Sequence, residues 1–314
     1  MLDPQAKALI DLVIKMGIPP TETLTPAQAR AFYSERRDFS QPDPPSIASV
    51  RDVQAPGPDG PITVRCYRPA GSAEADILPA LVYYHGGGHV IGDLETHDVI
   101  CRQLGNLAGC AVFAVDYRLA PEHIFPAAAV DCIAATRWVH DQAAALHIDP
   151  ARIAVGGDSA GGQLAAVVCL ALRDAAAFTP VLQLLIYPVS DACARTASMQ
   201  ANAQGYLLTK ASIDYFYGHY MPQEWMRLDW RASPLRAADH RNLPPALVLT
   251  AGFDPLRDEG LLYADKLSAA GVPTQYICFE RQIHGFALMG RILDEANTAV
   301  RLLAQALRER FAAS

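Results

Sequence analysis

Apolar residues near the start of this chain recur at intervals of three and four, which is the spacing of one face of a helix. The pattern predicts a first helix that ends at Gly17 and the prolines after it, because neither residue type continues a helix. A second helix is predicted after Thr25, which suits the N-cap, while Pro26 suits the first helical position and Gln28 can complete a capping box. The proline-rich residues 41–45 then form a linker. The apolar stripe of the first helix consists of Leu2, Ala6, Leu9, Val13 and Met16.

From about residue 47 the pattern changes to short apolar runs that alternate with helical stretches. This alternation predicts an α/β fold, with a mainly parallel central sheet and helices on both faces. The predicted strands are residues 62–67, 81–84, 111–115, 152–156, 182–187, 246–250 and 274–279. The predicted helices are residues 99–107, 126–144 and 259–270, and a last helix with an apolar stripe at Ile292, Ala296, Val300, Leu303 and Leu307.

One stretch, residues 191–231, breaks this rhythm. It is rich in tyrosine and tryptophan but contains no clear strand, so we interpret it as an inserted helical segment. This insertion divides the α/β part into residues 46–190 and 232–314, and the helical residues 1–45 precede it.

A candidate nucleophile lies between the predicted strand 152–156 and the helix that follows it. The sequence Gly157-Asp158-Ser159-Ala160-Gly161 fits G-x-S-x-G, in which a serine sits on a sharp strand-to-helix turn with its hydroxyl exposed. Such a turn leaves little space for neighbouring side chains, and the small residues around Ser159 satisfy that requirement.

A serine hydroxyl needs a base to take its proton, and the base needs a third group to hold it. Asp254 follows the predicted strand 246–250, and His284 lies on the loop after the last predicted strand. Asp258 and Glu259 are alternative candidates for the acid of the triad. They lie where a helix begins, however, and acidic residues there usually interact with the helix dipole. The chain order Ser159, Asp254, His284 is that of the α/β-hydrolase arrangement. The other histidines are interpreted as solvated or packed.

A second glycine run follows the predicted strand 81–84. Gly86, Gly87 and Gly88 let the backbone approach a substrate closely, and backbone N–H groups can stabilise an oxyanion. His85 and His89 stand four residues apart, but three intervening glycines disfavour the helix that a zinc pair would need. We therefore expect no metal and no other cofactor, and we expect His85 to brace the loop.

Together these residues resemble the hormone-sensitive-lipase-like family of α/β-hydrolases, the bacterial family IV esterases. The resemblance covers residues 60–310 and implies an α/β-hydrolase fold with a helical cap made of residues 1–45 and 191–231. It implies Ser159 as nucleophile, His284 as base and Asp254 as orienting acid. It also implies an oxyanion hole formed by Gly87, Gly88 and Ala160. The matching segments are residues 85–88, 116–122, 157–161, 254–258 and 284–286.

The sequence departs from the family at His89, where the family usually has an aromatic residue after the three glycines. This departure concerns the wall of the pocket. We expect the substrate to contact His89, Tyr187, Tyr206 and Leu208, with Tyr187 as the floor for a short acyl chain. Asp116, Arg118 and Glu122 are expected to pin the loop beside the site.

The charge and composition of the chain exclude some classes of binding partner. The formal net charge is −7 and no basic run occurs, which argues against nucleic acid and against a strongly anionic membrane surface. Charged residues are spaced along the first fifteen positions, so a secretory signal is not expected, and no stretch approaches the ~20 apolar residues of a membrane helix. The seven cysteines are scattered, as in reduced compartments. We expect a soluble, cytoplasmic protein, and the family resemblance suggests a homodimer.

The sequence therefore predicts a serine carboxylesterase that acts on small-molecule esters. Two alternatives stay open at this stage. The same machinery can cleave amides or thioesters, and a protein of this fold that has lost its catalysis can bind a small molecule.

Overall fold

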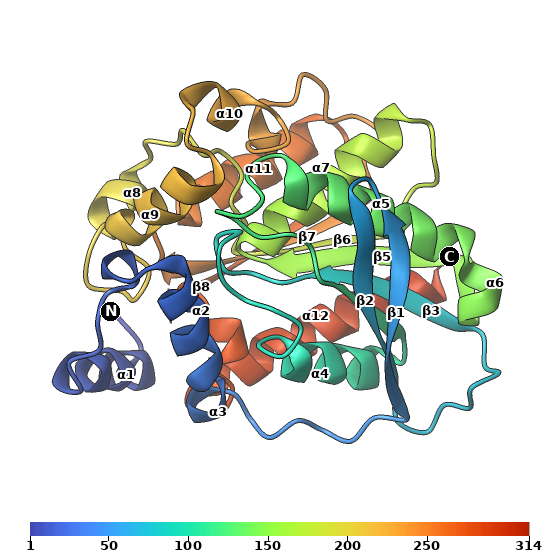
Figure 1. Cartoon of the computed structure of the whole chain (residues 1–314), viewed down its shortest axis with the longest axis horizontal. Helices are drawn as coiled ribbons and strands as arrows, with labels where there is room; N and C mark the ends of the chain where they lie inside the picture. Colours follow the sequence, from blue (N-terminus) through green and yellow to red (C-terminus); the bar gives the residue numbers. More distant parts are fainter. Residues whose placement is uncertain (314) are drawn as a thin grey trace.

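The computed structural model describes residues 1–313, and an eight-stranded sheet runs through its centre (Figure 1). The strand order is β1-β2-β4-β3-β5-β6-β7-β8; β1–β2 and β2–β4 pair antiparallel and the remaining neighbours pair parallel. The predicted α/β fold with a mainly parallel sheet is confirmed. The strands are β1 (Ser49–Gly57), β2 (Gly60–Arg68), β3 (Leu78–Tyr84), β4 (Ala111–Val115), β5 (Ile148–Asp158), β6 (Gln183–Ile186), β7 (Ala246–Phe253) and β8 (Thr274–Ile283).

Strand β1 was not predicted from the sequence. It lies at the edge of the sheet and pairs only with β2, so most of its side chains remain exposed. An edge strand of this kind needs few apolar residues, and its sequence gives no hydrophobic signal. The other predicted strands are present, although β5 begins earlier and β7 and β8 end later than predicted.

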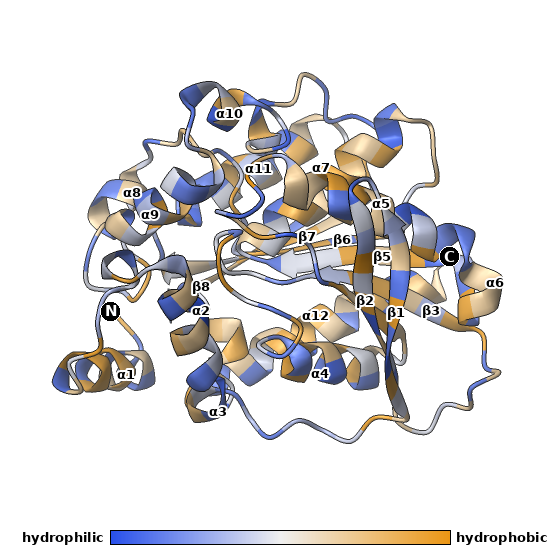
Figure 2. Cartoon of the chain, in the orientation of Figure 1, coloured by the Kyte–Doolittle hydropathy of each residue, from blue (hydrophilic) through white to orange (hydrophobic). Residues whose placement is uncertain are grey.

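Helices cover both faces of the sheet, as predicted (Figure 1). On one face lie α4 (Asp98–Ala108) and α12 (Asp294–Ala312), and on the other lie α5 (Ala127–Asp141), α7 (Ala160–Asp174) and α11 (Arg257–Ala269). The predicted helix 126–144 is interrupted near Gln142, so a short α6 (Ala143–Leu146) follows α5. Helices α5, α10 (Glu224–Leu228) and α12 carry hydrophobic and hydrophilic residues side by side (Figure 2), as expected for helices with one buried side.

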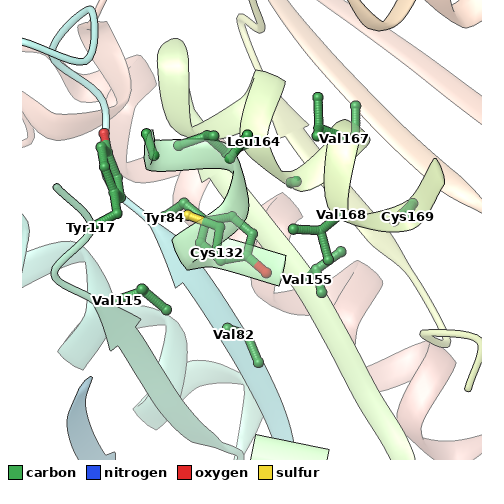
Figure 3. Packing of buried hydrophobic residues seen from close by; sticks show 14 of the residues in the cluster. Val82, Tyr84, Val115, Tyr117, Cys132, Val155, Leu164, Val167, Val168 and Cys169 are labelled. Atoms are coloured by element: carbon green, nitrogen blue, oxygen red, sulfur yellow. The ribbon is translucent and has the colours of Figure 1, made fainter. Parts of the chain in front are cut away.

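The two faces of the sheet have separate apolar cores because consecutive strand residues point in opposite directions. On β3, Val82 and Tyr84 belong to the core beneath α5 and α7, whereas Leu81 and Tyr83 belong to the core beneath α4 and α12. Figure 3 shows part of the first core, in which Val82 and Tyr84 of β3 and Val155 of β5 belong to one cluster with Leu164 and Val168 of α7. These cores hold β3 and β5 in place beneath the loops that follow them.

Two helical regions lie outside the α/β layers, at the end where the parallel strands terminate (Figure 1). The N-terminal region holds α1 (Pro4–Lys15), η1 (Thr21–Thr23), α2 (Pro26–Glu35) and α3 (Arg37–Ser40), and the capping box predicted at Thr25 is present. The second region holds α8 (Ala197–Ala201), α9 (Lys210–Tyr220) and α10. A hydrogen bond of 2.9 Å from Ser212 Oγ to Glu22 Oε2 joins the two regions. Short 3₁₀ turns complete the chain: η2 (Pro234–Arg236) and η3 (Phe286–Leu288).

Ion pairs fix the loop after β4, where the sequence predicted pinning residues. The buried carboxylate of Asp131 accepts two hydrogen bonds from the guanidinium of Arg118 and one from its backbone N–H, at 2.8–3.1 Å. Glu122 accepts hydrogen bonds of 2.9 and 2.6 Å from Arg30, which belongs to α2. Asp116 contributes through its backbone, whose N–H donates to the carbonyl of Thr63 at 3.0 Å. The loop is thus tied both to the core and to the N-terminal helices.

Asp131→Ala should lower the free energy of unfolding by about 2–3 kcal/mol. The variant leaves Arg118 without its buried partner, although the guanidinium can turn partly towards water. Urea denaturation followed by circular dichroism measures this change. Asp214→Ala, which removes an exposed i,i+4 pair with Lys210 on α9, is the matched control and should cost no more than about 0.5 kcal/mol. Equal losses in the two variants would contradict a structural role for the Arg118–Asp131 pair.

Candidate active site

Ser159 occupies a strained turn between β5 and α7. Its φ and ψ angles are 56° and −117°, a conformation that residues with side chains rarely adopt. The chain passes so close to β3 that a Cβ atom at Gly157 or Gly161 would overlap the carbonyl oxygen of Tyr84. Small residues are therefore a geometric requirement here, as the sequence indicated, and the turn exposes the Ser159 hydroxyl to the space above the sheet.

Three side chains from three strand ends meet at this turn. His284 Nε2 lies 2.9 Å from Ser159 Oγ, and His284 Nδ1 lies 2.7 Å from Asp254 Oδ2. Asp254 follows β7 and His284 follows β8, and these two strands are parallel neighbours. The structure brings together the serine, histidine and aspartate that the sequence singled out.

The surroundings of Asp254 fix its orientation. Its carboxylate is fully buried, and the second oxygen accepts a hydrogen bond of 2.8 Å from the backbone N–H of Leu256. The Asn202 side chain donates to the Asp254 carbonyl at 3.1 Å. The sequence did not single out Asn202, because it lies 52 residues away along the chain.

The competing acids serve other contacts. Asp258 accepts a hydrogen bond of 2.7 Å from the backbone of Ser198, and Glu259 accepts one of 2.7 Å from the backbone of Ser190. Burial raises the pKa of Glu259 to about 8. Both residues therefore brace the start of the segment that carries α8.

The loop after β3 presents backbone donors next to Ser159. Gly87 and Gly88 have φ angles of 115° and 60°, and a Cβ atom would overlap Ile91 at the first position and the Phe216 ring at the second. Within residues 1–313, the N–H groups of Gly87, Gly88 and Ala160 donate no hydrogen bond. Three such donors are therefore available to a ligand.

His85 braces this loop from below, as predicted. Its Nδ1 lies 2.7 Å from the carbonyl of Gly86, and the Tyr117 hydroxyl donates to the His85 carbonyl at 2.7 Å. The Tyr117 ring also stacks on the imidazole, with a centroid distance of 4.2 Å. Burial lowers the pKa of His85 to about 4, so the ring is neutral near pH 7.

A cavity of about 460 Å³ opens above Ser159 and His284. Three of the four predicted contact residues line it: His89, Tyr187 and Leu208. Tyr206 does not line it, since its ring packs against Phe253 at a centroid distance of 5.0 Å.

His89 and Tyr187 are held firmly in the cavity wall. The His89 ring is buried and stacks on Tyr220 at 4.1 Å, and burial lowers its pKa to about 3. It therefore packs as a neutral flat ring, which explains how histidine replaces the aromatic residue usual in the family. The Tyr187 ring lies 4.7 Å from the ring of His284.

Sequence reasoning missed the outer part of the cavity. Its apolar lining comes from one side of α1 and from residues near α3 and η3 that are far apart in sequence: Leu9, Leu12, Val13, Met16, Phe39, Leu288 and Met289. The available signal was the apolar stripe of α1. Part of that stripe faces the cavity, so the helix contributes to the site as well as to the core.

Two observations concern other kinds of site. Among residues 1–313, no three histidine, cysteine or acidic side chains gather as a metal-binding group. No helix in the described part of the chain is long and apolar enough to cross a membrane.

Comparison with known proteins identifies the family of this chain. A profile of the alpha/beta hydrolase fold matches residues 81–288. The chain is 45% identical to the carboxylic ester hydrolase LipN of Mycobacterium tuberculosis, over 86% of this chain and 72% of LipN. It is 40% identical to ethyl acetate hydrolase of Pseudomonas putida, over 98% of this chain and 99% of the relative.

Solved structures of ester hydrolases are also similar to this chain. The ester-hydrolase EH1AB1 from the metagenome of Lake Arreo, solved with a derivative of bipyridine phosphonate, is 47% identical, with a TM-score of 0.96 over 99% of this chain and 100% of its own. An esterase of Pyrobaculum calidifontis is 39% identical, with a TM-score of 0.91 over 98% of this chain and 99% of its own. The chain therefore belongs to the hormone-sensitive-lipase-like family of alpha/beta hydrolases.

Proposed function

We propose that this chain is a carboxylic-ester hydrolase that works through an acyl-enzyme, with Ser159 as nucleophile, His284 as base and Asp254 as the acid that orients it. The observation that carries the proposal is the pair of short hydrogen bonds that link the three side chains, 2.9 and 2.7 Å long. The relatives named above are ester hydrolases, which supports esters as the substrate class.

The first half of the reaction acylates Ser159. His284 Nε2 takes the hydroxyl proton while the Ser159 oxygen attacks the ester carbonyl. The carbonyl oxygen becomes negative and accepts hydrogen bonds from the free N–H groups of Gly87, Gly88 and Ala160, which are already in position. Asp254 stabilises the imidazolium that forms. The proton then passes from His284 to the departing alcohol.

The second half releases the acid. A water molecule takes the place of the alcohol and gives its proton to His284 Nε2 as it attacks the acyl carbon. The same backbone donors stabilise the second oxyanion. The Ser159 oxygen then leaves and recovers its proton from His284, so that neither protons nor electrons accumulate.

Residues 1–45 and 191–231 are proposed to form the cap over this site. Both segments supply walls of the cavity, and the Ser212–Glu22 hydrogen bond connects them. The core then comprises residues 46–190 and 232–314. The cap encloses the bound ester and excludes bulk water, which strengthens the electrostatic interactions inside.

The proposed substrates are esters with short acyl groups, because Tyr187 stands behind His284 as a bulky wall. Cleavage of amides or thioesters has less support, since the relatives are named for esters. A non-catalytic binder also has less support, since all three reacting side chains are present and in contact.

A cytoplasmic location and a homodimer are proposed as well. All seven cysteines are unpaired, and five of them are buried, which agrees with a reducing compartment. For the dimer, the support is the family resemblance.

Ser159→Ala should lower the hydrolysis rate of p-nitrophenyl acetate by roughly 10⁶, because no other group near His284 can form the acyl-enzyme. The fold should be unchanged, since alanine fits the turn. Ser268→Ala, an exposed serine on α11, is the matched control and should keep the wild-type rate. A Ser159→Ala enzyme that retains more than a few per cent of the activity would rule out the proposed nucleophile.

Asp254→Asn should lower kcat by about 10⁴ and leave KM within a few-fold of wild type. The amide would favour the wrong tautomer of His284, while the binding cavity would stay intact. Steady-state kinetics with the same ester measure both constants. A loss that lies mainly in KM would show that Asp254 acts on binding and not on the base.

Tyr187→Ala should move the acyl-chain optimum of kcat/KM to longer acids. Wild type should prefer acyl groups of about two to six carbons. Each methylene gains only ~1 kcal/mol of binding free energy until the acyl chain reaches the wall at Tyr187, and longer chains no longer fit. A series of p-nitrophenyl esters from about two to sixteen carbons measures the profile. Tyr206→Ala, an aromatic deletion outside the cavity, is the control and should leave the profile unchanged. A wild-type maximum at about twelve carbons or more would contradict the short-acyl proposal.

A further inference from the structure

Asp158, the residue before the nucleophile, makes contacts that the reaction described above does not use. Its side chain is buried, at 3% exposure, and contacts the loop after β3. Its Oδ1 accepts a hydrogen bond of 3.0 Å from the backbone N–H of Gly86 and one of 2.9 Å from the Tyr83 hydroxyl. One carboxylate thus connects the nucleophile turn to the start of the glycine run.

A second histidine lies behind this carboxylate. His97 Nε2 is 3.3 Å from Asp158 Oδ1, and its Nδ1 is 3.0 Å from Thr96 Oγ1. The Gly86 N–H that donates to Asp158 also donates to His97 Nε2, at 3.2 Å. From the sequence, His97 was interpreted as a packed or solvated histidine, and in the structure it is almost fully buried. Burial opposes ionisation of Asp158, but the charge and hydrogen bond of His97, with the hydrogen bond of Tyr83, lower the pKa of Asp158 overall. Asp158 is therefore a carboxylate near neutral pH, when it is the stronger acceptor.

This carboxylate contacts the backbone just before the free donors. Gly86 precedes Gly87 and Gly88, whose N–H groups are available to a substrate. The Gly86 peptide lies against Asp158 so closely that a Cβ atom there would overlap the carboxylate. The peptides that carry the Gly87 and Gly88 N–H groups are held at their carbonyls, Gly86 by His85 Nδ1 and Gly87 by the N–H groups of Val90 and Ile91. A shift of the Gly86 backbone would nevertheless carry both N–H groups with it, and the hydrogen bond to Asp158 opposes that shift.

We propose that Asp158, beside His97 and Tyr83, is a positioning residue of the oxyanion hole, because it holds the Gly86 N–H from the nucleophile side and thereby helps to direct the N–H groups of Gly87 and Gly88 at the substrate carbonyl. This inference rests on the proposed ester hydrolysis. Asp158 and Ser159 are adjacent in the chain, so one segment sets both the attacking oxygen and the donors that receive the negative charge.

The test compares Asp158→Ala with Asp158→Asn. Asp158→Ala should lower kcat by about 10²–10³, as the loss of an oxyanion donor does, while KM changes less than about threefold. Asp158→Asn keeps an oxygen that can accept from Gly86 and should recover kcat to within about tenfold of wild type. The burst amplitude counts the active sites in each preparation, so that kcat can be expressed per folded enzyme molecule.

A trifluoromethyl ketone separates positioning from a merely structural role. Ser159 adds to its carbonyl to form a hemiketal whose oxyanion uses the same donors as the transition state, so the Ki should rise in proportion to the fall in kcat/KM. The acid limb of the pH–rate profile should stay where it is in wild type, because the contacts of His284 are untouched. A change in stability alone would alter the fraction of active sites but neither Ki nor the normalised kcat.

If Asp158→Ala does not fold, comparing Tyr83→Phe with Tyr84→Phe tests whether the contacts of Asp158 support catalysis. They are neighbours on β3, and each loses one buried hydrogen bond, to Asp158 and to Thr136 respectively. Tyr83→Phe should lower normalised kcat about threefold to tenfold, whereas Tyr84→Phe should leave it unchanged.

Two results would overturn the proposal: a normalised kcat or Ki of Asp158→Ala within threefold of wild type, or equal kcat values for the two tyrosine variants. The proposed function fails separately, if wild type does not hydrolyse esters or if Ser159→Ala remains active.

Discussion

The close approach of two strand ends is the constraint on which the site depends. Strands β3 and β5 are parallel neighbours, and Tyr84 at the end of β3 pairs in register with Gly157. Only glycine fits at 157 and 161, because any side chain would meet the Tyr84 carbonyl. This contact allows the chain to turn sharply at Ser159 and brings the glycine loop after β3 within reach of the serine.

The strand order explains why the reacting groups meet at this place. From β3 the chain crosses to β4 on one side and later to β5 on the other, so β3 and β5 flank a topological switch point. Loops at the carboxyl ends of strands diverge at such a point and leave room for a ligand. Beyond β6 in the sheet, β7 and β8 bring Asp254 and His284 to the same edge. The N-terminal helices and the segment with α8–α10 then cover the opening.

Two histidine–aspartate pairs flank Ser159, and their settings differ. His284 and Asp254 lie beside the cavity, where a proton must move. His97 and Asp158 lie beneath the glycine loop and are buried, with a longer separation of 3.3 Å. In the proposed arrangement the first pair manages the proton and the second maintains the geometry of the donors. Burial lowers the pKa values of His85 and His89, so both rings are neutral near pH 7 and add no positive charge around the site.

The sequence by itself determined the local features of this protein. Apolar periodicity identified most strands and helices, and the glycine spacing around Ser159 identified the turn, because both reflect sterics within a few residues. Asp254 and His284 could be selected because each follows a strand, and parallel strands end at one edge. Tertiary structure alone decided which distant side chains share a space. The cavity face of α1, the absence of Tyr206 from the cavity and the burial of His97 against Asp158 all depend on packing between segments tens of residues apart. Strand β1 depends on its pairing with β2 at the edge of the sheet, which leaves no apolar pattern in its sequence. Hydrophobic pattern shows that a residue is buried, but it does not show what the residue is buried against.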